Sequence, residues 1–385
     1  MLHQHFKTPS GGGAIRSYYL AKALVDHGHR VVVITTHNQS TKLSLDNDGI
    51  EIHYLPIAYD NRFAFYARAW SFIRFVISAC IEAAQFRDFD KCYAISVPLT
   101  VGLAARWIKI RHGIPYYFEV GDLWPDAPIE MGIVRNYFLK KTLFSLEKSI
   151  YTNSAKIIAL SPAIQNAVEA RVPGKEVVWI SNVSDCEFYL PEHKDPKLEV
   201  KYHVQGKFVV SYMGAVGEAN GLEYFLDCAA SALQSIPQVQ FMLCGDGARL
   251  VALKEKANRL QLSNLSFIDF VNRDGVRDLM NVTDAVFVCY KQLPILETGC
   301  PNKYFDGLAA GKIMVINFGG WIRKEMEENR CGIYVDPSNP DDFRGKLDAL
   351  LSNVQKQDSI RLASRSLAER KYSRKLLMEE FVKQF

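Results

Sequence analysis

The sequence has few features of membrane-spanning, disulfide-bonded or nucleic-acid-binding proteins. No apolar run approaches the roughly 18 residues that a bilayer-spanning helix needs. Its eight cysteines form no Cys-x-x-Cys pair and no His/Cys cluster at zinc spacing, so we expect reduced thiols and no structural metal. The formal charge is only +4, without a basic stripe, which disfavours nucleic acid as a partner.

Signals for export, repeats and low complexity are also absent from the sequence. The amino-terminal residues, Met-Leu-His-Gln-His-Phe, lack the basic start and apolar core of a signal peptide, so we expect a cytoplasmic protein. No repeat of fixed period and no low-complexity tract occurs, which excludes solenoids and linker arrays. What is present is a balance of 48% hydrophobic and 23% charged residues in 385. This length and composition predict a globular chain of two domains.

Short apolar, β-branched runs alternate with longer helical patterns, which is typical of parallel sheets covered by helices on both faces. In the first half, strands are predicted at Leu2–Phe6, Val31–Thr36, Glu51–Leu55, Cys92–Ser96, Tyr116–Val120, Ile157–Ser161 and Val177–Ile180. In the second half, they are predicted at Phe208–Met213, Gln240–Cys244, Ser266–Asp269, Ala285–Cys289, Met314–Asn317 and Gly332–Val335.

These patterns predict an α/β fold of two Rossmann-like domains, residues 1–190 and 191–385, facing each other across a cleft. A polar, Pro-containing stretch from Leu190 to Pro196 lies between the halves. The tail from about Pro340 to Phe385 is helix-rich and is expected to pack back across the domain boundary. Doubly wound sheets bind ligands beyond the carboxyl ends of their strands, so the site is expected in the cleft.

A glycine run, Ser10-Gly11-Gly12-Gly13, follows the first predicted strand and opens a helix from about Ala14 to His27. Backbone N–H groups there can approach an anion closely, so a phosphate or a sugar fits. The run does not match the Gly-x-Gly-x-x-Gly spacing of dinucleotide sites. Taken alone, the run is therefore weak evidence for an anion site, and a plain turn between strand and helix is the alternative.

A second motif, Glu119-Val120-Gly121-Asp122-Leu123-Trp124-Pro125-Asp126, begins at the carboxyl end of a predicted strand. Such folds place reacting groups at this edge, so Asp122 and Glu119 are candidate bases. Asp122 and Asp126 could equally cap the loop before the prolines. Trp124 could stack on a sugar or anchor the core.

The segment from Leu296 to Lys312 is the most informative stretch, because it reads as a loop feeding a helix from about Asn302 to Ala310. The free N–H groups at that helix start make an anion site, with Glu297 before it and Asp306 one turn inside it. A nucleotide sugar offers sugar hydroxyls, a diphosphate and ribose hydroxyls in that order. Alternatively, both acids are ordinary exposed residues near a helix N-terminus, where the dipole stabilises them by about 0.3–1 kcal/mol.

Taken together, the motifs resemble the retaining GT-B glycosyltransferases of family 4, over nearly the whole chain. The first, second and last blocks are more similar to the branch that builds bacterial O-antigens, capsules and exopolysaccharides than to sucrose or glycogen synthases. The blocks are Gly11-Gly12-Gly13 before Arg16–Leu24, Gly121–Pro125, Ile180–Asp185 with Phe188, and Pro301–Asp306 through Gly311-Lys312.

The resemblance implies transfer with retention, no required metal or other cofactor, and a nucleotide sugar held mainly by residues 191–385 as a substrate. By carry-over, Glu297 would contact the donor sugar and take part in catalysis, Asp306 would hold the ribose, and the backbone at Val271 and Asn272 would read the base. The remaining expected donor-binding residues are Gly12, Gly13, Gly214, Gly299, Cys300, Asn302 and Lys303.

The same resemblance assigns residues 1–190 to the acceptor. Asp122 falls where the family places a residue near the acceptor hydroxyl, so it is the candidate for orienting or deprotonating that group. Arg16, Glu119 and Trp124 are expected to contact the acceptor.

Two departures from the family pattern affect the expected donor site. Glu297 and Asp306 are separated by eight residues, where the family has two glutamates separated by seven, and the second acid is one methylene shorter. The Arg and Lys that many members use to neutralise the diphosphate appear here as Ala215 and Asn220. Lys303 and Arg249 are the nearest substitutes.

Two stretches, Asn61–Phe89 and Arg135–Lys148, combine aromatic residues with arginines or lysines. Both read as amphipathic helices whose apolar faces serve the core. A basic, aromatic face is also what a monotopic enzyme lays on anionic lipid, so peripheral contact with the inner face of the membrane is the second interpretation.

The sequence thus favours an enzyme that moves a hexose-type sugar from a nucleotide donor, with UDP as the expected nucleotide, to a lipid-linked or saccharide acceptor in bacterial surface polysaccharide biosynthesis. One alternative is a nucleotide-sugar epimerase or hydrolase of the same architecture. Another is a scaffold of weak activity that binds nucleotide or lipid, which the residues at Ala215 and Asn220 motivate.

Overall fold

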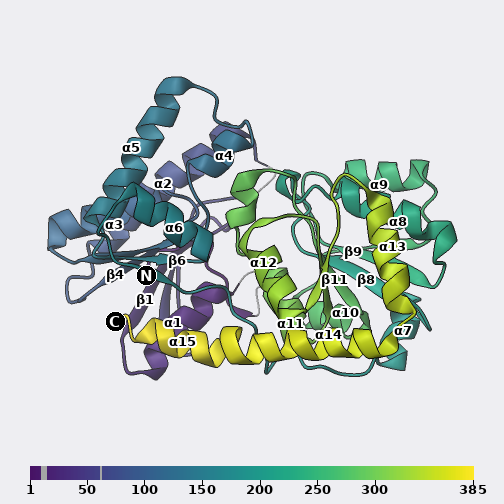
Figure 1. The fold of residues 1–385 in the computed structure, drawn as a ribbon. Helices are drawn as coiled ribbons and strands as arrows, with labels where there is room; N and C mark the ends of the chain where they lie inside the picture. The colour runs from purple at the N-terminus through teal and green to yellow at the C-terminus, as the bar shows by residue number, and fades with distance from the viewer. Residues whose placement is uncertain (10–14, 61–62) are drawn as a thin grey trace.

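The computed structural model describes residues 1–9, 15–60 and 63–385. It forms two α/β halves side by side, with a long helical segment running beneath both (Figure 1). In the part of the chain that the structure describes, no helix is both long and apolar enough to cross a membrane.

The first half contains two sheet sections joined at Leu2, one mixed and one parallel. One section has the order β1-β3-β2 and the other the order β4-β5-β6-β7, and Leu2 bridges Ile34 of β1 and Ala94 of β4. The strands are β1 (Val31–His37), β2 (Leu43–Asn47), β3 (Ile50–Pro56), β4 (Cys92–Ile95), β5 (Tyr116–Val120), β6 (Lys156–Ala159) and β7 (Val177–Trp179). The helices are α1 (Arg16–Asp26), α2 (Phe65–Ala83), α3 (Val101–His112), α4 (Asp126–Glu130), α5 (Tyr137–Asn153) and α6 (Pro162–Arg171).

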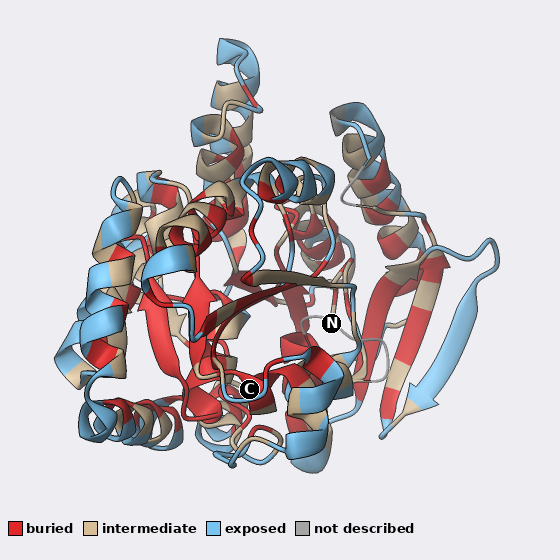
Figure 2. Cartoon of the chain, turned by 90° about the vertical axis from the view of Figure 1, so that its right-hand side faces the viewer, coloured by how far each residue is buried: buried red, intermediate tan, exposed pale blue. Residues whose placement is uncertain are grey.

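Two details of this half differ from the sequence prediction. The expected strand Leu2–Phe6 is reduced to the single bridging residue Leu2, because the chain turns at His3–Phe6, where the Phe6 amide donates to the His3 carbonyl at 3.4 Å. Strand β2 was not predicted, and it is the antiparallel edge strand that lies pale blue and exposed in Figure 2.

The second half is a single parallel sheet with the order β10-β9-β8-β11-β12-β13. Its strands are β8 (Phe208–Met213), β9 (Val239–Cys244), β10 (Leu265–Ile268), β11 (Ala285–Val288), β12 (Ile313–Ile316) and β13 (Gly332–Tyr334). Its helices are α7 (Pro196–Tyr202), α8 (Glu223–Ser235), α9 (Leu250–Arg259), α10 (Arg273–Val282), α11 (Asn302–Ala309), α12 (Gly320–Asn329) and α13 (Pro340–Leu351). This order reverses between β8 and β11, which makes their carboxyl ends the topological switch point of a doubly wound sheet.

The C-terminal helices return to the first half of the chain. After α14 (Val354–Leu367) and a π-helical turn at Ala368–Tyr372, α15 (Arg374–Val382) packs against α1. Met378 and Phe381 are buried in one cluster with Leu20 and Tyr93. At the very end, Lys91 donates to the Phe385 carbonyl at 2.7 Å. The last helix is therefore part of the first half's core.

Candidate functional site

The switch point carries a tight backbone turn directly after β8. Gly214 has φ of 145°, and a Cβ placed on Gly245 after β9 would lie 1.9 Å from the Gly214 carbonyl oxygen. The two loops are thus packed backbone against backbone, which only glycine permits. Beside this turn, the Lys303 side chain of α11 comes within 3.2 Å of the position that a Cβ on Gly214 would take.

Lys303 points from the first turn of α11 back toward this turn. Its Nζ would lie 3.4 Å from a Cβ placed on Gly214, and it lies 4.7 Å from the centre of the Tyr212 ring. Burial lowers the pKa of the Lys303 ammonium to about 8. Within the described part of the chain this half-buried ammonium forms no hydrogen bond or ion pair, and the carboxylate of Asp306 acts on it only from a distance.

Arg249, the other expected substitute for the missing cations, is already engaged. Its guanidinium pairs with Glu223 and, at 3.4 Å, with Glu218. Glu218 in turn pairs with Lys291. The charge of Arg249 is therefore balanced within the chain, and of the two expected substitutes Lys303 is the one without an ion pair among the described residues.

Asp306 lies one turn further along α11 and is half-buried. Burial raises the pKa of its carboxyl to about 7, while nearby Arg273 and Lys303 lower it. Arg273 pairs with Asp185 and stacks over Phe188 at 3.6 Å. Asp306 thus approaches Arg273 without a direct ion pair to it.

The residues expected to read the base flank the start of α10, at the carboxyl edge of β10. The Asn272 side chain caps α10 by accepting from the Gly275 amide at 2.9 Å. Val271 packs against the same glycine, since a Cβ at Gly275 would lie 2.7 Å from the Val271 Cβ. Both residues adjoin Arg273 and so lie on the Asp306 side of the site.

Glu297 lies on the 3-10 turn Pro294–Thr298 and is directed toward the start of α12. A Cβ on Gly319 would come within 2.9 Å of its Oε1, and one on Gly320 within 2.6 Å of its backbone carbonyl oxygen. The two glycines therefore let the Glu297 carboxylate approach the α12 backbone closely.

The loop between Glu297 and α11 is held from two sides. Trp321 donates its indole N–H to the Gly299 carbonyl at 2.9 Å, and the Asn182 side chain donates to the Cys300 carbonyl. Asn302, the first residue of α11, is exposed. These contacts hold the loop while leaving the helix start accessible.

The first half of the chain also contacts the segment that carries Glu297. The Ser161 hydroxyl donates to the Thr298 carbonyl at 2.6 Å, and the Ile295 amide donates to Glu130 of α4 at 3.1 Å. These hydrogen bonds couple the segment to the opposite domain.

We expect the Glu130→Ala substitution to lower the free energy of unfolding by about 0.5–1.5 kcal/mol, because it removes the acceptor of the Ile295 amide. Urea unfolding measures this difference. Glu130→Gln, which keeps an acceptor oxygen, should stay close to the parent. Equal losses for both variants would argue against this hydrogen bond.

Asp122 lies across from the same segment, on the loop after β5. Solvent reaches its carboxyl, yet surrounding protein atoms desolvate it and raise its pKa. Its charge acts on the Tyr290 hydroxyl and the Cys300 thiol of the opposite half. The structure thus brings Asp122 close to the loop before α11, and Asp122 forms no ion pair with any described residue.

Tyr290 is a site residue that the sequence analysis missed. Its amide donates to Asn317 at 2.9 Å, its carbonyl accepts from the same side chain at 3.1 Å, and its ring packs edge-on to Phe318. The hydroxyl, which has no hydrogen-bond partner among the described residues, lies 3.8 Å from a Cβ placed on Gly299. The available signal was an aromatic residue just after a buried strand at the switch point.

Arg16 and Glu119, expected to contact an acceptor, are instead committed to each other. Both are buried, and the Arg16 Nε and Nη2 donate to the Glu119 carboxylate at 3.2 and 3.1 Å. Arg16 also donates to the carbonyls of Ile180 and Ser181, and Tyr93 donates to Glu119. We therefore replace the acceptor-binding role with a structural one, because the pair fixes α1 and β5 to the chain that leaves the first half.

Two further expectations concern Trp124, Gly12 and Gly13. Trp124 is half-buried and packs against the main hydrophobic core, in keeping with the anchoring alternative. Gly12 and Gly13, with the rest of the glycine run, lie outside the described residues.

Comparison with known proteins gives matches over both halves of the chain. Residues 11–182 match the family model of the glycosyl transferase 4-like domain, and residues 207–353 match that of the glycosyl transferases group 1. Spore coat protein SA of Bacillus subtilis is 21% identical over 262 residues, which are 64% of this chain and 68% of that protein.

Solved structures show the same architecture. The structure of Anabaena HepE in complex with UDP-glucose has a TM-score of 0.72 and 17% identity, covering 100% of this chain and 97% of that one. WaaG, a glycosyltransferase involved in lipopolysaccharide biosynthesis, has a TM-score of 0.70 and 13% identity, with 100% and 98% coverage. The chain is therefore a glycosyltransferase of the GT-B type, built from a glycosyl transferase 4-like domain and a glycosyl transferases group 1 domain.

Proposed function

We propose that this glycosyltransferase moves a hexose from a UDP-sugar, with retention at the anomeric carbon, to a lipid-linked or saccharide acceptor in the synthesis of a bacterial surface polysaccharide. The observation that carries the proposal is the unpaired Lys303 ammonium at the switch point, with Asp306 beside it and Asp122 opposite. The UDP-glucose bound to HepE and the lipopolysaccharide role of WaaG support the choice of donor and product.

In this proposal, positive charge at the diphosphate comes from Lys303 and the N–H groups at the start of α11, because charge-assisted hydrogen bonds exceed neutral ones in strength. Asp306 accepts the ribose hydroxyls, Glu297 contacts the donor sugar, and Val271 and Asn272 lie beside the base. Asp122 orients or deprotonates the acceptor hydroxyl. No resident metal is required, so we expect transfer to persist in EDTA.

The donor assignment is tested by thermal unfolding with UDP, GDP and UDP-glucose. A ligand at about 100 times its dissociation constant should stabilise the protein by roughly 2.7 kcal/mol. We expect UDP to bind more tightly than GDP, and Glu297→Ala and Asp306→Ala to weaken UDP-glucose binding about tenfold, the equivalent of about 1.4 kcal/mol.

Glu328→Ala, which removes an exposed acid of α12, serves as the matched control and should bind as the parent does. Unchanged binding by both site variants would contradict the donor assignment. Product analysis then separates transfer from epimerisation or hydrolysis, since only transfer yields a glycosylated acceptor.

A further inference from the structure

Helix α2 carries a second apolar stripe that its own packing does not use. One face packs into the core through Phe75, Ala79 and Ala83. Four other apolar residues leave 47–66% of their surface exposed, and their spacing of three or four residues places them on one stripe. They are Trp70, Ile73, Ile77 and Ile81. A helix that is apolar on both faces needs a second apolar environment.

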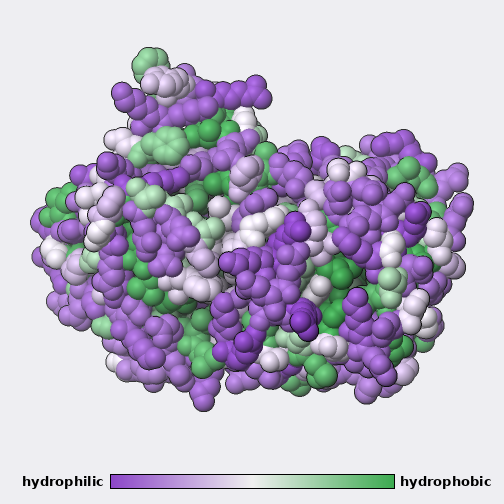
Figure 3. Space-filling view, in the orientation of Figure 1, coloured by the Kyte–Doolittle hydropathy of each residue, from purple (hydrophilic) through white to green (hydrophobic). Residues whose placement is uncertain are grey.

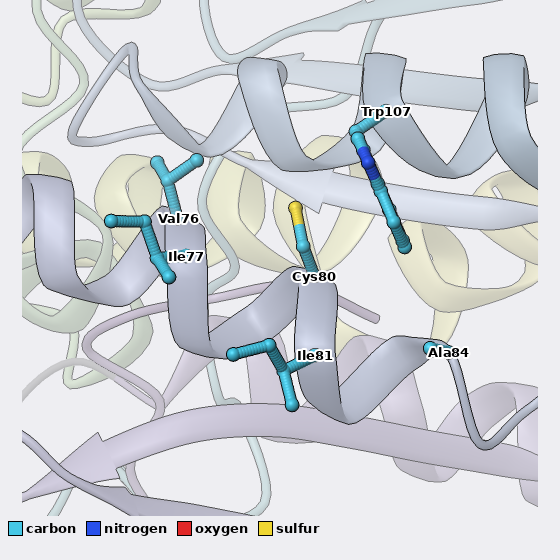
Figure 4. A pocket seen from close by; sticks show the side chains of 6 residues that line it. All are labelled: Val76, Ile77, Cys80, Ile81, Ala84 and Trp107. Atoms are coloured by element: carbon cyan, nitrogen blue, oxygen red, sulfur yellow. The ribbon is translucent and has the colours of Figure 1, made fainter.

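The exposed stripe borders an apolar groove between α2 and α3. The groove, of about 540 Å³, is lined by Val76, Ile77, Cys80, Ile81, Ala84 and Trp107. Figure 4 shows Cys80 of α2 and Trp107 of α3 extending into the space between the two helices. No charged side chain lines the groove, so its natural occupant is hydrocarbon.

A second recess, of about 510 Å³, lies on the other side of α3, against α5. Its lining combines Arg106 and Lys141 with the hydroxyls of Thr142, Ser145 and Ser149, beside Phe138 and Leu146. Arg106 donates to the Ser149 hydroxyl at 2.8 Å, but its buried Nε has no hydrogen-bond partner. Two cations and three hydroxyls suit a phosphate group.

The exposed charged side chains of helices α2, α3 and α5 are all positive. The only acids in α2, α3 and α5 are Glu82 and Glu147, which are buried and paired with Lys42 and Arg171. Among the described residues, none of the following cations of these helices belongs to an ion pair. They are Arg106, Lys109, Arg111, Lys140, Lys141 and Lys148.

Exposed aromatic residues accompany this charge on α5, the helix that projects from the first half in Figure 1. Tyr137 and Phe138 leave 71% and 76% of their surface exposed. The space-filling view shows hydrophobic and hydrophilic residues interspersed over this projection (Figure 3). Lysine beside exposed aromatic rings is typical of a surface that inserts into the headgroup region of a bilayer.

We propose that the outer surface of α2, α3 and α5, here called the α2–α3–α5 face, docks on a bilayer of anionic phospholipid. A lipid phosphate occupies the recess at Arg106 and Lys141, and acyl chains cover the groove at Ile77, Ile81 and Trp107. A second copy of the chain would bring like charges together, whereas anionic lipid complements them. This inference rests on the proposed function, because an enzyme that uses a lipid-linked acceptor must reach the membrane surface.

Sedimentation with vesicles tests the proposal on the full-length protein. We expect binding to phosphatidylcholine vesicles that contain about 30% phosphatidylglycerol, little binding to pure phosphatidylcholine, and loss of binding as NaCl rises from about 0.1 to 0.5 M. Lys141→Glu/Lys148→Glu should weaken binding about tenfold or more. Ile77→Ser/Ile81→Ser should also weaken binding to the vesicles that contain phosphatidylglycerol, because it removes apolar side chains that border the groove.

Two controls keep the result specific to this face. Lys197→Glu/Lys254→Glu makes the same change of charge at exposed lysines of the second half and should bind vesicles as the parent does. Inorganic phosphate at about 10 mM should not release the protein, since lipid offers many phosphates and an apolar phase. Release by phosphate would identify a site for free anions and overturn the proposal.

Absence of binding to anionic vesicles, or equal binding by the parent and Lys141→Glu/Lys148→Glu, would also overturn it. So would dimerisation that Ile77→Ser/Ile81→Ser abolishes, measured by light scattering, because the face would then be an interface between copies. Stabilisation by UDP is measured on the same preparations. If the protein binds vesicles but is not stabilised by UDP, only the proposed donor is contradicted. If UDP stabilises the protein but vesicles do not bind, only the docking face is contradicted.

Discussion

The Asp122→Asn substitution is expected to lower kcat for sugar transfer by about 10²- to 10⁴-fold, the range that a positioned general base contributes. The affinity for UDP should stay within about twofold of the parent, because Asp122 lies on the loop after β5 and faces the acceptor side. Asparagine keeps the shape of the side chain but cannot accept a proton. Initial rates with saturating donor, and calorimetric titration with UDP, measure the two quantities.

The pH dependence of transfer provides a second readout of the same group. Desolvation raises the pKa of the Asp122 carboxyl, so the carboxylate that serves as base is lost as pH falls through this raised pKa. We expect kcat of the parent to decline on the acidic side, and the residual activity of Asp122→Asn to lack that decline. Asp126→Asn is the control, since Asp126 pairs with Arg171 at 2.8 Å. If Asp126→Asn lowered kcat as much as Asp122→Asn does, the loss would reflect a destabilised loop and Asp122 would not be the base.

The Lys303→Met substitution should change stability and binding in opposite directions. Methionine removes a half-buried, desolvated and unpaired charge while filling a similar volume, so the unliganded protein should become as stable as the parent or more stable. UDP affinity should fall about 10- to 150-fold, since a charge-assisted hydrogen bond contributes about 1.5–3 kcal/mol. Urea unfolding without ligand and calorimetric titration with UDP measure the two effects.

The lowered pKa of Lys303 also predicts how stability and UDP affinity change with pH. Its pKa is about 8 in the folded protein and 10.5 as the unperturbed value, so the folded state binds fewer protons between these limits. Stability should therefore rise with pH from about 8 to 10.5 in the parent, with this contribution absent in Lys303→Met. UDP affinity should decline above pH 8, because the ammonium that meets the diphosphate is lost there.

The chain provides a matched control in Lys312, just beyond the other end of α11. Burial lowers the pKa of Lys312 to about 8 as well, but it donates to the Asn281 carbonyl at 3.3 Å and lies near Asp284. Lys312→Met should lower the free energy of unfolding, because it removes the hydrogen bond to Asn281, and should leave UDP affinity unchanged. If both methionine variants bind UDP as the parent does, the diphosphate is held without Lys303 and the site assignment is wrong.

The second sheet could be read from the sequence to within one residue at each strand end. Strands such as Phe208–Met213 and Ala285–Val288 are buried at every position, so each appears as an apolar run, interrupted in the first only by Ser211. Strand β2 escaped prediction because Leu43–Asn47 is almost wholly exposed and is specified by pairing with β3. Local pattern does not encode such pairing.

Side-chain roles were harder to predict where they depend on distant partners. Arg16 and Glu119 are 103 residues apart in sequence, and only the fold reveals that they neutralise each other. Lys303 and Arg249 were equal candidates for the missing cation until the structure showed Arg249 paired with two glutamates. Tyr290 belongs to no motif, and only the folded loop after β11 shows its hydroxyl beside Gly299.

The return of α15 to the first half has a consequence for movement between the domains. The chain passes between the halves twice, and the two passages lie side by side: Ser184 bridges Ser373, with its amide donating to the Tyr372 carbonyl at 2.7 Å. Asp185, next to this bridge, contacts Tyr19 of the first half, Arg273 of the second, and Arg374 of α15. Because the two passages are adjacent and share Asp185 as an anchor, we infer that they act as one hinge. We therefore expect any movement between the halves to turn about this point and to change the separation of Asp122 and Lys303.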